Sequence, residues 1–284
     1  MRVSISKSPV SIDDITAIVA THERQHPLNE MIKSFREHYP QLKIIAVDSS
    51  RKTNKREDIQ HILTDSNAWI SNQRNIALQE VKTSLFLLLD DDYVCTSKTD
   101  IEKLMDQVIN WNYSIIWGQL NNIWSEQYDF HGYYTIIWDT LYHFVDKKDP
   151  SSNKYDVIFN FFVWETAQIK SMGWWDDNLK YAREHDDFFL TAKEKNILTS
   201  YDTTVSVDHY SYDKYHGWPK SDPCVRYFLW KWNIKNKIEV RLIQKWSNNP
   251  YISYHNCISH DQYINQDIQE KITSMYWNYP IIIS

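Results

Sequence analysis

The first half of the chain alternates short apolar runs with amphipathic segments. Residues 15–24 (ITAIVATHER) begin as a β-branched run and end in polar side chains, which predicts a buried strand opening onto a loop. Residues 26–40 place apolar side chains at helical spacing until Pro40, and residues 42–50 (LKIIAVDSS) predict a second strand. A strand, a helix and a strand in this order imply a parallel sheet, which binds ligands outside the carboxyl ends of its strands.

The same alternation continues along the chain. Residues 61–66 predict a short edge strand, and residues 71–81 predict a helix with Ser71 at its N-cap. The most apolar run, SLFLLL at 84–89, predicts a buried strand that stops abruptly at three aspartates. Further elements are a helix at 101–110, strands at 114–120 and 197–210, and a helix around REHDDFFL at 183–190. The charged, Pro-containing stretch 146–154 predicts a linker or mobile loop.

Composition narrows the class of protein. A formal net charge of -6 argues against binding to a nucleic-acid backbone, which requires a basic surface. The three cysteines are far apart and odd in number, so neither a disulfide framework nor a zinc site is predicted. The chain shows no signal-peptide pattern and no run of the roughly 20 apolar residues that a membrane span needs. We therefore expect a soluble, cytoplasmic chain.

The acidic triplet Asp90-Asp91-Asp92 is the strongest chemical signal. Adjacent carboxylates at the edge of an apolar core repel one another, so a cation is expected there. Carboxylate oxygens suit hard divalent ions such as magnesium or manganese. Capping of the following helix explains one of these acids but not three. The triplet therefore predicts a metal site at the carboxyl end of a central strand.

A second acidic cluster lies in the predicted helix at 183–190. Glu184 and Asp187 are three residues apart and share a helical face, while Asp186 points elsewhere. A carboxylate beside apolar side chains can have a raised pKa and act as a general base, although a solvated helix face fits the same spacing. His209 follows a β-patterned segment and is either a metal ligand or a structural histidine.

Four segments resemble, in this order, those of the GT-A glycosyltransferases, and within them the inverting β-1,4-N-acetylgalactosaminyltransferase-like group. They are AIVATHER, IIAVDSS, SNQRNIALQEVKTSLFLLLDDDYV and GWWDDNLKYAREHDDFFL. The likeness spans residues 15 to about 210 and leaves the last 70 or so residues unmatched. It implies an α/β fold of the GT-A (Rossmann-like) type, with a mixed, mostly parallel central sheet flanked by helices.

The resemblance also implies a nucleotide pocket at the ends of the first strands. Thr21, Glu23 and Arg24 line this pocket, Asp48 contacts the uracil or its ribose, and Arg74 lies near the diphosphate.

The triplet matches the DxD motif of the group, and this match implies unequal roles. Asp90 lies on the nucleotide side, Asp92 binds the metal, and Asp91 is unresolved between them. His209 is implied as a second metal ligand by its order and spacing. Gly173, Trp174 and Trp175 match an acceptor loop that stacks on a sugar ring. The acidic motif, Glu-Asp in the group, reads Glu184-His185-Asp186-Asp187 here, which favours Asp187 as the base with Glu184 and Asp186 as alternatives.

The implied activity is metal-dependent, inverting transfer of a sugar from a UDP-sugar to a glycan hydroxyl. The donor would be UDP-N-acetylgalactosamine or a related UDP-hexose or UDP-pentose, and the acceptor an oligosaccharide, a glycolipid or a glycoprotein. One alternative is a sugar-nucleotide nucleotidyltransferase, which usually needs a glycine-rich, basic loop where this chain reads THERQHP. Another is a non-catalytic glycan-binding module, suggested by 13 Trp and 19 Tyr.

Residues 1–215 are predicted to form the catalytic domain, with a nucleotide-binding half at about 12–100 and an acceptor-binding half at about 101–215. Residues 216–284 would form an extension packed on the same domain. This tail contains WKWNIKNK, so a peripheral contact with a membrane surface stays open beside an acceptor subsite or an oligomer contact.

Overall fold

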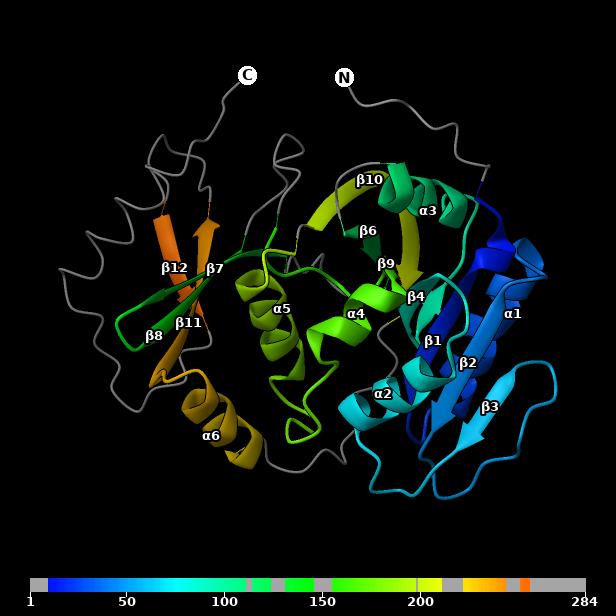
Figure 1. The fold of residues 1–284 in the computed structure, drawn as a ribbon, viewed down its shortest axis with the longest axis horizontal. Helices are drawn as coiled ribbons and strands as arrows, with labels where there is room; N and C mark the ends of the chain where they lie inside the picture. Colours follow the sequence, from blue (N-terminus) through cyan, green and yellow to red (C-terminus); the bar gives the residue numbers. More distant parts are fainter. Residues whose placement is uncertain are drawn as a thin grey trace.

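The computed structural model has an α/β fold (Figure 1). It describes residues 10–110, 114–123, 131–145, 155–197, 199–210, 222–243 and 251–255. The strands of the larger sheet are β1 (Ile15–Thr21), β2 (Lys43–Asp48), β3 (Gln60–Leu63), β4 (Leu85–Asp90), β5 (Tyr93–Val94), β6 (Ile115–Asn122), β9 (Phe162–Glu165) and β10 (Thr199–His209). Those of the smaller sheet are β7 (Gly132–Ile137), β8 (Thr140–Val145), β11 (Asn236–Ile243) and β12 (Tyr251–His255). The helices are η1 (Ile12–Asp14), α1 (Gln25–His38), α2 (Ile70–Glu80), α3 (Ile101–Asn110), α4 (Thr166–Met172), α5 (Glu184–Glu194) and α6 (Asp222–Lys231).

The larger sheet has the order β3-β2-β1-β4-β9-β6-β10-β5 within the described residues. Strands β3, β2, β1 and β4 are parallel, so their carboxyl ends meet at one edge of the sheet. Strand β9 runs antiparallel between β4 and β6, and β10 is parallel to β6. The predicted mixed, mostly parallel central sheet flanked by helices is therefore confirmed.

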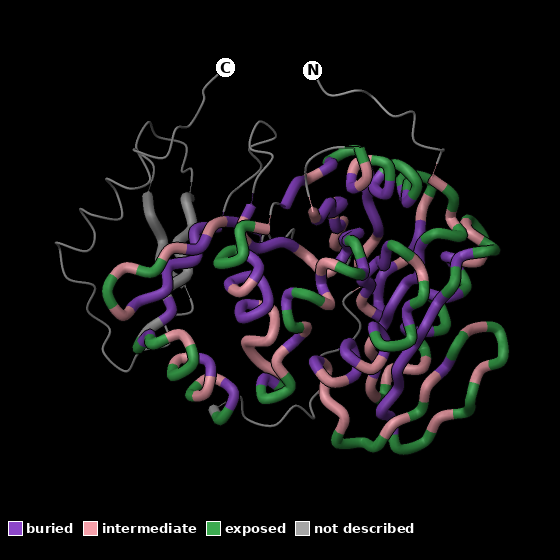
Figure 2. Tube along the Cα trace, viewed as in Figure 1, coloured by how far each residue is buried: buried purple, intermediate pink, exposed green. Residues whose placement is uncertain are grey.

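The apolar runs are buried on both faces of this sheet (Figure 2). On one face, Ile18 and Leu88 belong to the same core cluster as Leu78 of α2. On the other face, Val19 and Leu87 belong to a cluster that includes the apolar stripes of α1 and α3. Successive strand residues point to opposite faces, so a central strand covered by helices on both sides must be apolar throughout.

Strand β5 brings distant parts of the chain to the end of β4. It follows Asp92 directly and pairs antiparallel with the end of β10, in a register that sets Tyr93 opposite His209. The backbone N–H of Tyr210 also donates to the carbonyl of Asp92, at 3.1 Å. The acidic triplet and the end of β10 are therefore held side by side.

Ser71 is not the N-cap of α2, because Trp69 occupies that position and the Ser71 hydroxyl instead donates to the carbonyl of Leu179, at 2.6 Å. The expected linker at 146–154 lies outside the described residues.

The smaller sheet, in the order β12-β11-β8-β7, is not predicted by the sequence pattern, because its strands come from an aromatic segment and the unmatched tail. The described part of the chain holds no helix with the length and apolarity needed to cross a membrane.

Candidate active site

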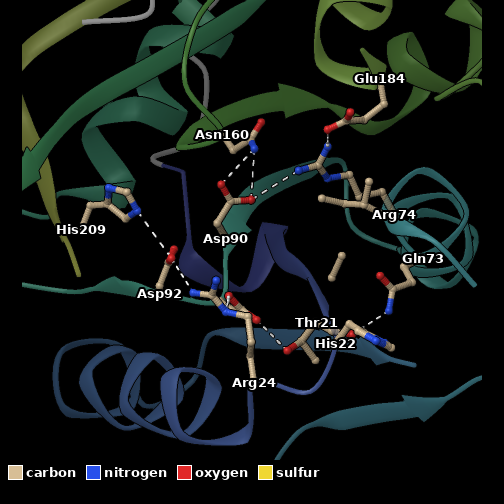
Figure 3. A pocket seen from close by; sticks show the side chains of 13 residues that line it. Thr21, His22, Arg24, Gln73, Arg74, Asp90, Asp92, Asn160, Glu184 and His209 are labelled. Carbon is tan, nitrogen blue, oxygen red and sulfur yellow. Dashed lines mark hydrogen bonds and ion pairs between the residues drawn. The ribbon is translucent and has the colours of Figure 1, made fainter. Parts of the chain in front are cut away.

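A pocket of about 320 Å³ opens at the carboxyl ends of β1 and β4 (Figure 3). Its walls come from the loop after β1, helix α2, the acidic triplet, the start of α5 and the end of β10. The described residues that line it are Ala20, Thr21, His22, Arg24, Ile70, Gln73, Arg74, Asp90, Asp91, Asp92, Asn160, Glu184 and His209. Sequence segments that lie far apart therefore supply one concave polar site.

Asp91 and Asp92 share one arginine. The Nε atom of Arg24 lies 3.0 Å from Asp91 Oδ1, and its Nη2 atom lies 2.5 Å from Asp92 Oδ2. The hydroxyl of Thr21 also donates to Asp91, at 2.6 Å. Both acids are buried, and Arg24 places one positive charge beside them.

The two carboxylates have opposite electrostatic environments. Burial raises the pKa of Asp91 to about 7, and the charge of Arg24 only partly offsets it. Burial also acts to raise the pKa of Asp92, but His209 and Arg24 outweigh it, so this pKa lies below its ordinary value. The pKa of His209 is raised, because the proximity of Asp92 outweighs the effect of burial.

Asp92 and His209 offer a donor pair that suits a divalent cation. The Nε2 atom of His209 lies 3.5 Å from Asp92 Oδ2, and its Nδ1 atom lies 2.7 Å from Asn122 Oδ1. An amide oxygen accepts, so Nδ1 carries a proton, and the raised pKa of His209 favours a second proton on Nε2, the nitrogen that faces Asp92. A divalent cation would take the place of that second proton. Within the described residues no three acidic, histidine or cysteine side chains form a cluster that could hold a metal. The pair fits a cation whose other ligands are phosphate oxygens and water.

Asp90 points toward Asn160 and Arg74, whereas Asp92 points toward His209 and Arg24 (Figure 3). It accepts hydrogen bonds from Arg74 at 3.3 Å, from the Asn160 amide at 3.0 Å to each oxygen, and from the Tyr93 hydroxyl at 3.1 Å. Arg74 is almost fully buried, and its other terminal nitrogen lies 3.7 Å from Glu184 Oε1. Arg74 therefore connects the acidic triplet to the start of α5.

The acids of α5 point to different parts of the molecule. Glu184 lines the pocket, and burial raises its pKa although the charge of Arg74 opposes the shift. Asp186 and Asp187 are buried and are not among the described pocket-lining residues. Asp186 pairs with Lys237, and Asp187 pairs with Lys231. The predicted common face of Glu184 and Asp187 thus does not bring both into the pocket.

Asp48 and Glu23 hold the loops beside the pocket and are not among its described lining. Asp48 is fully buried and accepts from the Gln25 amide at 2.7 Å and from the backbone N–H of Ser50 at 2.8 Å. Glu23 has a positive φ of 54° and accepts from the backbone N–H of Arg51, at 2.9 Å. Their implied contacts with a nucleotide stay predictions.

Of the two aromatic residues in the expected acceptor loop, Trp175 is buried and Trp174 is partly buried against the core. The Trp175 ring is 3% exposed and stacks on Phe188 at 4.5 Å, with Arg74 5.7 Å from its centroid. Its backbone exchanges two hydrogen bonds with the Asn75 side chain. Trp174 donates its ring N–H to the carbonyl of Lys170, at 3.2 Å. Trp175 is thus a core residue in this structure.

Sequence reasoning did not identify several pocket residues. Asn160 holds Asp90, and Gln73 donates from α2 to the carbonyl of Thr21, at 2.7 Å, and to Ser49 Oγ, at 3.0 Å. Gln73 stands beside Arg74 in the QRN segment, which is a usable signal. His22 stands between Thr21 and Glu23 in the THER segment, which is also a usable signal. Asn160 lacks such a signal, because a single amide between apolar residues is common.

The fold and this site define a class of protein: an α/β domain of the GT-A type with an acidic triplet at the ligand-binding edge of its sheet. The model of "Glycosyl transferase family 2" matches residues 16–166, and the chain belongs to this family.

Curated relatives agree with this classification. The chain is 27% identical over 230 residues to "Beta-1,4 N-acetylgalactosaminyltransferase 1" of Rattus norvegicus. The aligned region covers 74% of this chain and 41% of the relative. It is 24% identical over 198 residues to "Beta-1,4 N-acetylgalactosaminyltransferase 2" of Mus musculus, with coverage of 66% and 37%. The chain thus spans about two fifths of the length of the curated relatives it matches.

Solved structures share the fold. GalNAc-T7 with UDP, GalNAc and Mn2+ superposes with a TM-score of 0.60 at 13% identity, covering 76% of this chain and 47% of that one. S. aureus TarS 1-349 in complex with UDP-GlcNAc gives a TM-score of 0.55 at 12% identity, with coverage of 72% and 60%. At these identities the likeness concerns the fold alone.

Proposed function

We propose that this chain is a metal-dependent, inverting glycosyltransferase that moves a sugar from a UDP-sugar to a hydroxyl of a glycan. One observation carries the proposal: the acidic triplet, His209, Arg74 and Glu184 line the same pocket. Membership of glycosyl transferase family 2 supports sugar transfer over nucleotidyl transfer or glycan binding alone.

The donor would bind at the triplet end of the pocket. Asp92 and His209 would hold a manganese or magnesium ion. Arg74, which pairs with Asp90 and lines the same pocket, would lie near the diphosphate. When bound, the ion supplies Lewis-acid neutralisation of the departing nucleoside diphosphate. The solved complexes with UDP-GlcNAc and with UDP, GalNAc and Mn2+ share this fold and support a uridine nucleotide.

Glu184 is the general base that the geometry favours over Asp187 and Asp186. It faces the pocket, and its raised pKa suits a group that must accept a proton. The acceptor hydroxyl gives its proton to a carboxylate oxygen of Glu184, while the oxygen of the acceptor hydroxyl bonds to the anomeric carbon of the donor sugar. On the opposite face the bond to the β-phosphate oxygen breaks, and the configuration inverts. Asp187 instead accepts hydrogen bonds from Lys231 and Trp232.

The relatives indicate which sugar to test first. Both are N-acetylgalactosaminyltransferases by name, which supports UDP-N-acetylgalactosamine as the donor, with related UDP-hexoses and UDP-pentoses as alternatives. The acceptor would be an oligosaccharide, a glycolipid or a glycoprotein.

The test is UDP release from a panel of UDP-sugars with manganese, with and without a mixture of glycan acceptors. Glu184→Gln should lower release by about 100- to 10,000-fold, the usual contribution of a general base. Glu194→Gln, in the exposed last turn of the same helix, is the matched control and should keep wild-type turnover. Full turnover of Glu184→Gln would remove Glu184 from the mechanism, and loss in Asp187→Asn alone would restore Asp187 as the base.

A further inference from the structure

We propose that Lys231 and Lys237 are positioning residues, which hold the first turn of α5 so that Glu184 faces the pocket. The inference rests on the proposed function, because it concerns the orientation of the proposed base. Both lysines lie beyond residues 16–166, the part of the chain that the family model matches.

Helix α6 holds Asp187. The Nζ atom of Lys231 lies 2.8 Å from Asp187 Oδ1 and 2.9 Å from Oδ2, and the indole N–H of Trp232 donates to Oδ1 at 2.8 Å. The same Nζ atom lies 2.8 Å from Asp176 Oδ2, which also accepts from the Tyr227 hydroxyl at 3.0 Å. One ammonium group thus joins α6 to α5 and to the loop before α5.

The smaller sheet holds Asp186. Lys237 of β11 donates to Asp186 Oδ1 at 2.6 Å, and the hydroxyl of Tyr134 in β7 donates to the same oxygen at 2.5 Å. The other oxygen lies 3.0 Å from Nη1 of Arg183. The side chains of Asp186 and Lys237 are each only 5% exposed, so this is a buried ion pair in which Asp186 accepts from three donors.

These contacts fix the backbone that carries Glu184. The helix begins with three carboxylates in its first turn, directly after Arg183 in the left-handed region at φ 67°. His185 adds a third anchor, because its Nε2 atom lies 2.6 Å from the carbonyl of Ile158. Glu184 is one residue before this anchored stretch, and a displacement of about 1 Å in catalytic geometry can cost about 100-fold in rate. Asp186 and Asp187 therefore serve as attachment points for the two lysines.

The experiment compares Lys231→Met, which removes the charge, with Lys231→Arg, which keeps it. With UDP-N-acetylgalactosamine as the probe, Lys231→Met should lower kcat by about 10- to 100-fold and leave the donor KM within about twofold, because the triplet is untouched. Lys231→Arg should recover most of kcat. Lys235→Met is the matched control: its side chain is 79% exposed and pairs with Asp139, so kcat should not change.

Lys237→Met should show the same loss of kcat. If this substitution of a buried lysine prevents folding, the result for Lys231→Met tests the inference by itself. Wild-type kcat in Lys231→Met would overturn the inference, and so would an equal loss of kcat and UDP affinity. A wild-type protein that releases no UDP from any UDP-sugar would instead count against the proposed function. If the wild type and Lys231→Met are equally active while Glu184→Gln is inactive, the inference about Lys231 is refuted and the proposed function is not.

Discussion

The Nη1 atom of Arg74 lies 3.7 Å from Oε1 of Glu184, so a buried cation on α2 faces the carboxylate that begins α5. Burial disfavours the charged form of Glu184, and the guanidinium favours it. The balance between these two effects sets how readily Glu184 takes up a proton. Changes at Arg74 should therefore appear in the pH dependence of the reaction.

Arg74→Met should move the acidic limb of the kcat–pH profile to higher pH. A general base must be ionised, so with Glu184 in this proposed role the rate falls as pH falls through its pKa, and loss of the guanidinium raises that pKa further. The measurement is kcat between about pH 5 and 9. An unchanged limb would mean that the titrating group is not Glu184.

Asp186→Asn should destabilise the fold, because it leaves Lys237 buried beside a neutral amide. Breaking a buried ion pair costs about 3 to 5 kcal/mol, and urea denaturation would measure the decrease in the free energy of unfolding. Lys237 and Arg183 hold the pKa of Asp186 below its ordinary value despite burial. The contribution of the Asp186 charge to the free energy of unfolding is therefore complete above the unfolded-state pKa of about 3.9, and it is lost as the pH falls further.

The difference between wild type and Asp186→Asn should consequently narrow below about pH 4. Asp139→Asn, which removes an exposed ion pair with Lys235, is the control and should leave the unfolding midpoint unchanged. A constant difference at all pH values would contradict the assignment of the destabilisation to the charge of Asp186.

Trp175→Ala should act mainly on stability. Its ring stacks on Phe188 in the core, and truncation of a buried aromatic residue costs about 3 to 5 kcal/mol. Thermal unfolding would measure this change, with Trp138→Ala as a control whose side chain is 68% exposed. An increased acceptor KM without a loss of stability would instead support the platform role that the sequence resemblance implies.

The sequence predicted β1, β2, β3, β4, β6 and β10 of the larger sheet because each is a distinct apolar or β-patterned run, but it did not predict β5 and β9, which are short. SLFLLL, for example, is buried between α2 on one face and α1 and α3 on the other, so its position in the centre of the sheet could be expected. The smaller sheet could not be predicted in the same way. Its strand β8 is buried at every position, and long-range pairing with β11 rather than local periodicity defines it.

The candidate site was predicted in part. The triplet, Arg74 and His209 were identified, and the structure brings them to one pocket. The direction of each α5 acid was not predictable, because it depends on Lys231 and Lys237, which lie about 45 and 50 residues further along the chain. Helical spacing alone places Glu184 and Asp187 on one face, but the ion pair with α6 draws Asp187 away from the pocket.

Calorimetric titration of UDP into the wild-type protein and Asp92→Asn, each with and without manganese, tests the proposal that Asp92 holds a metal ion that binds the donor. Asp208→Asn, one residue before His209, is a control that keeps the proposed ligands. We predict that manganese tightens UDP binding to wild type and to Asp208→Asn by at least about tenfold, and that Asp92→Asn loses this gain, as expected when a metal ligand is removed. UDP binding of equal strength in wild type and Asp92→Asn with manganese present, or no UDP binding at all, would contradict the account.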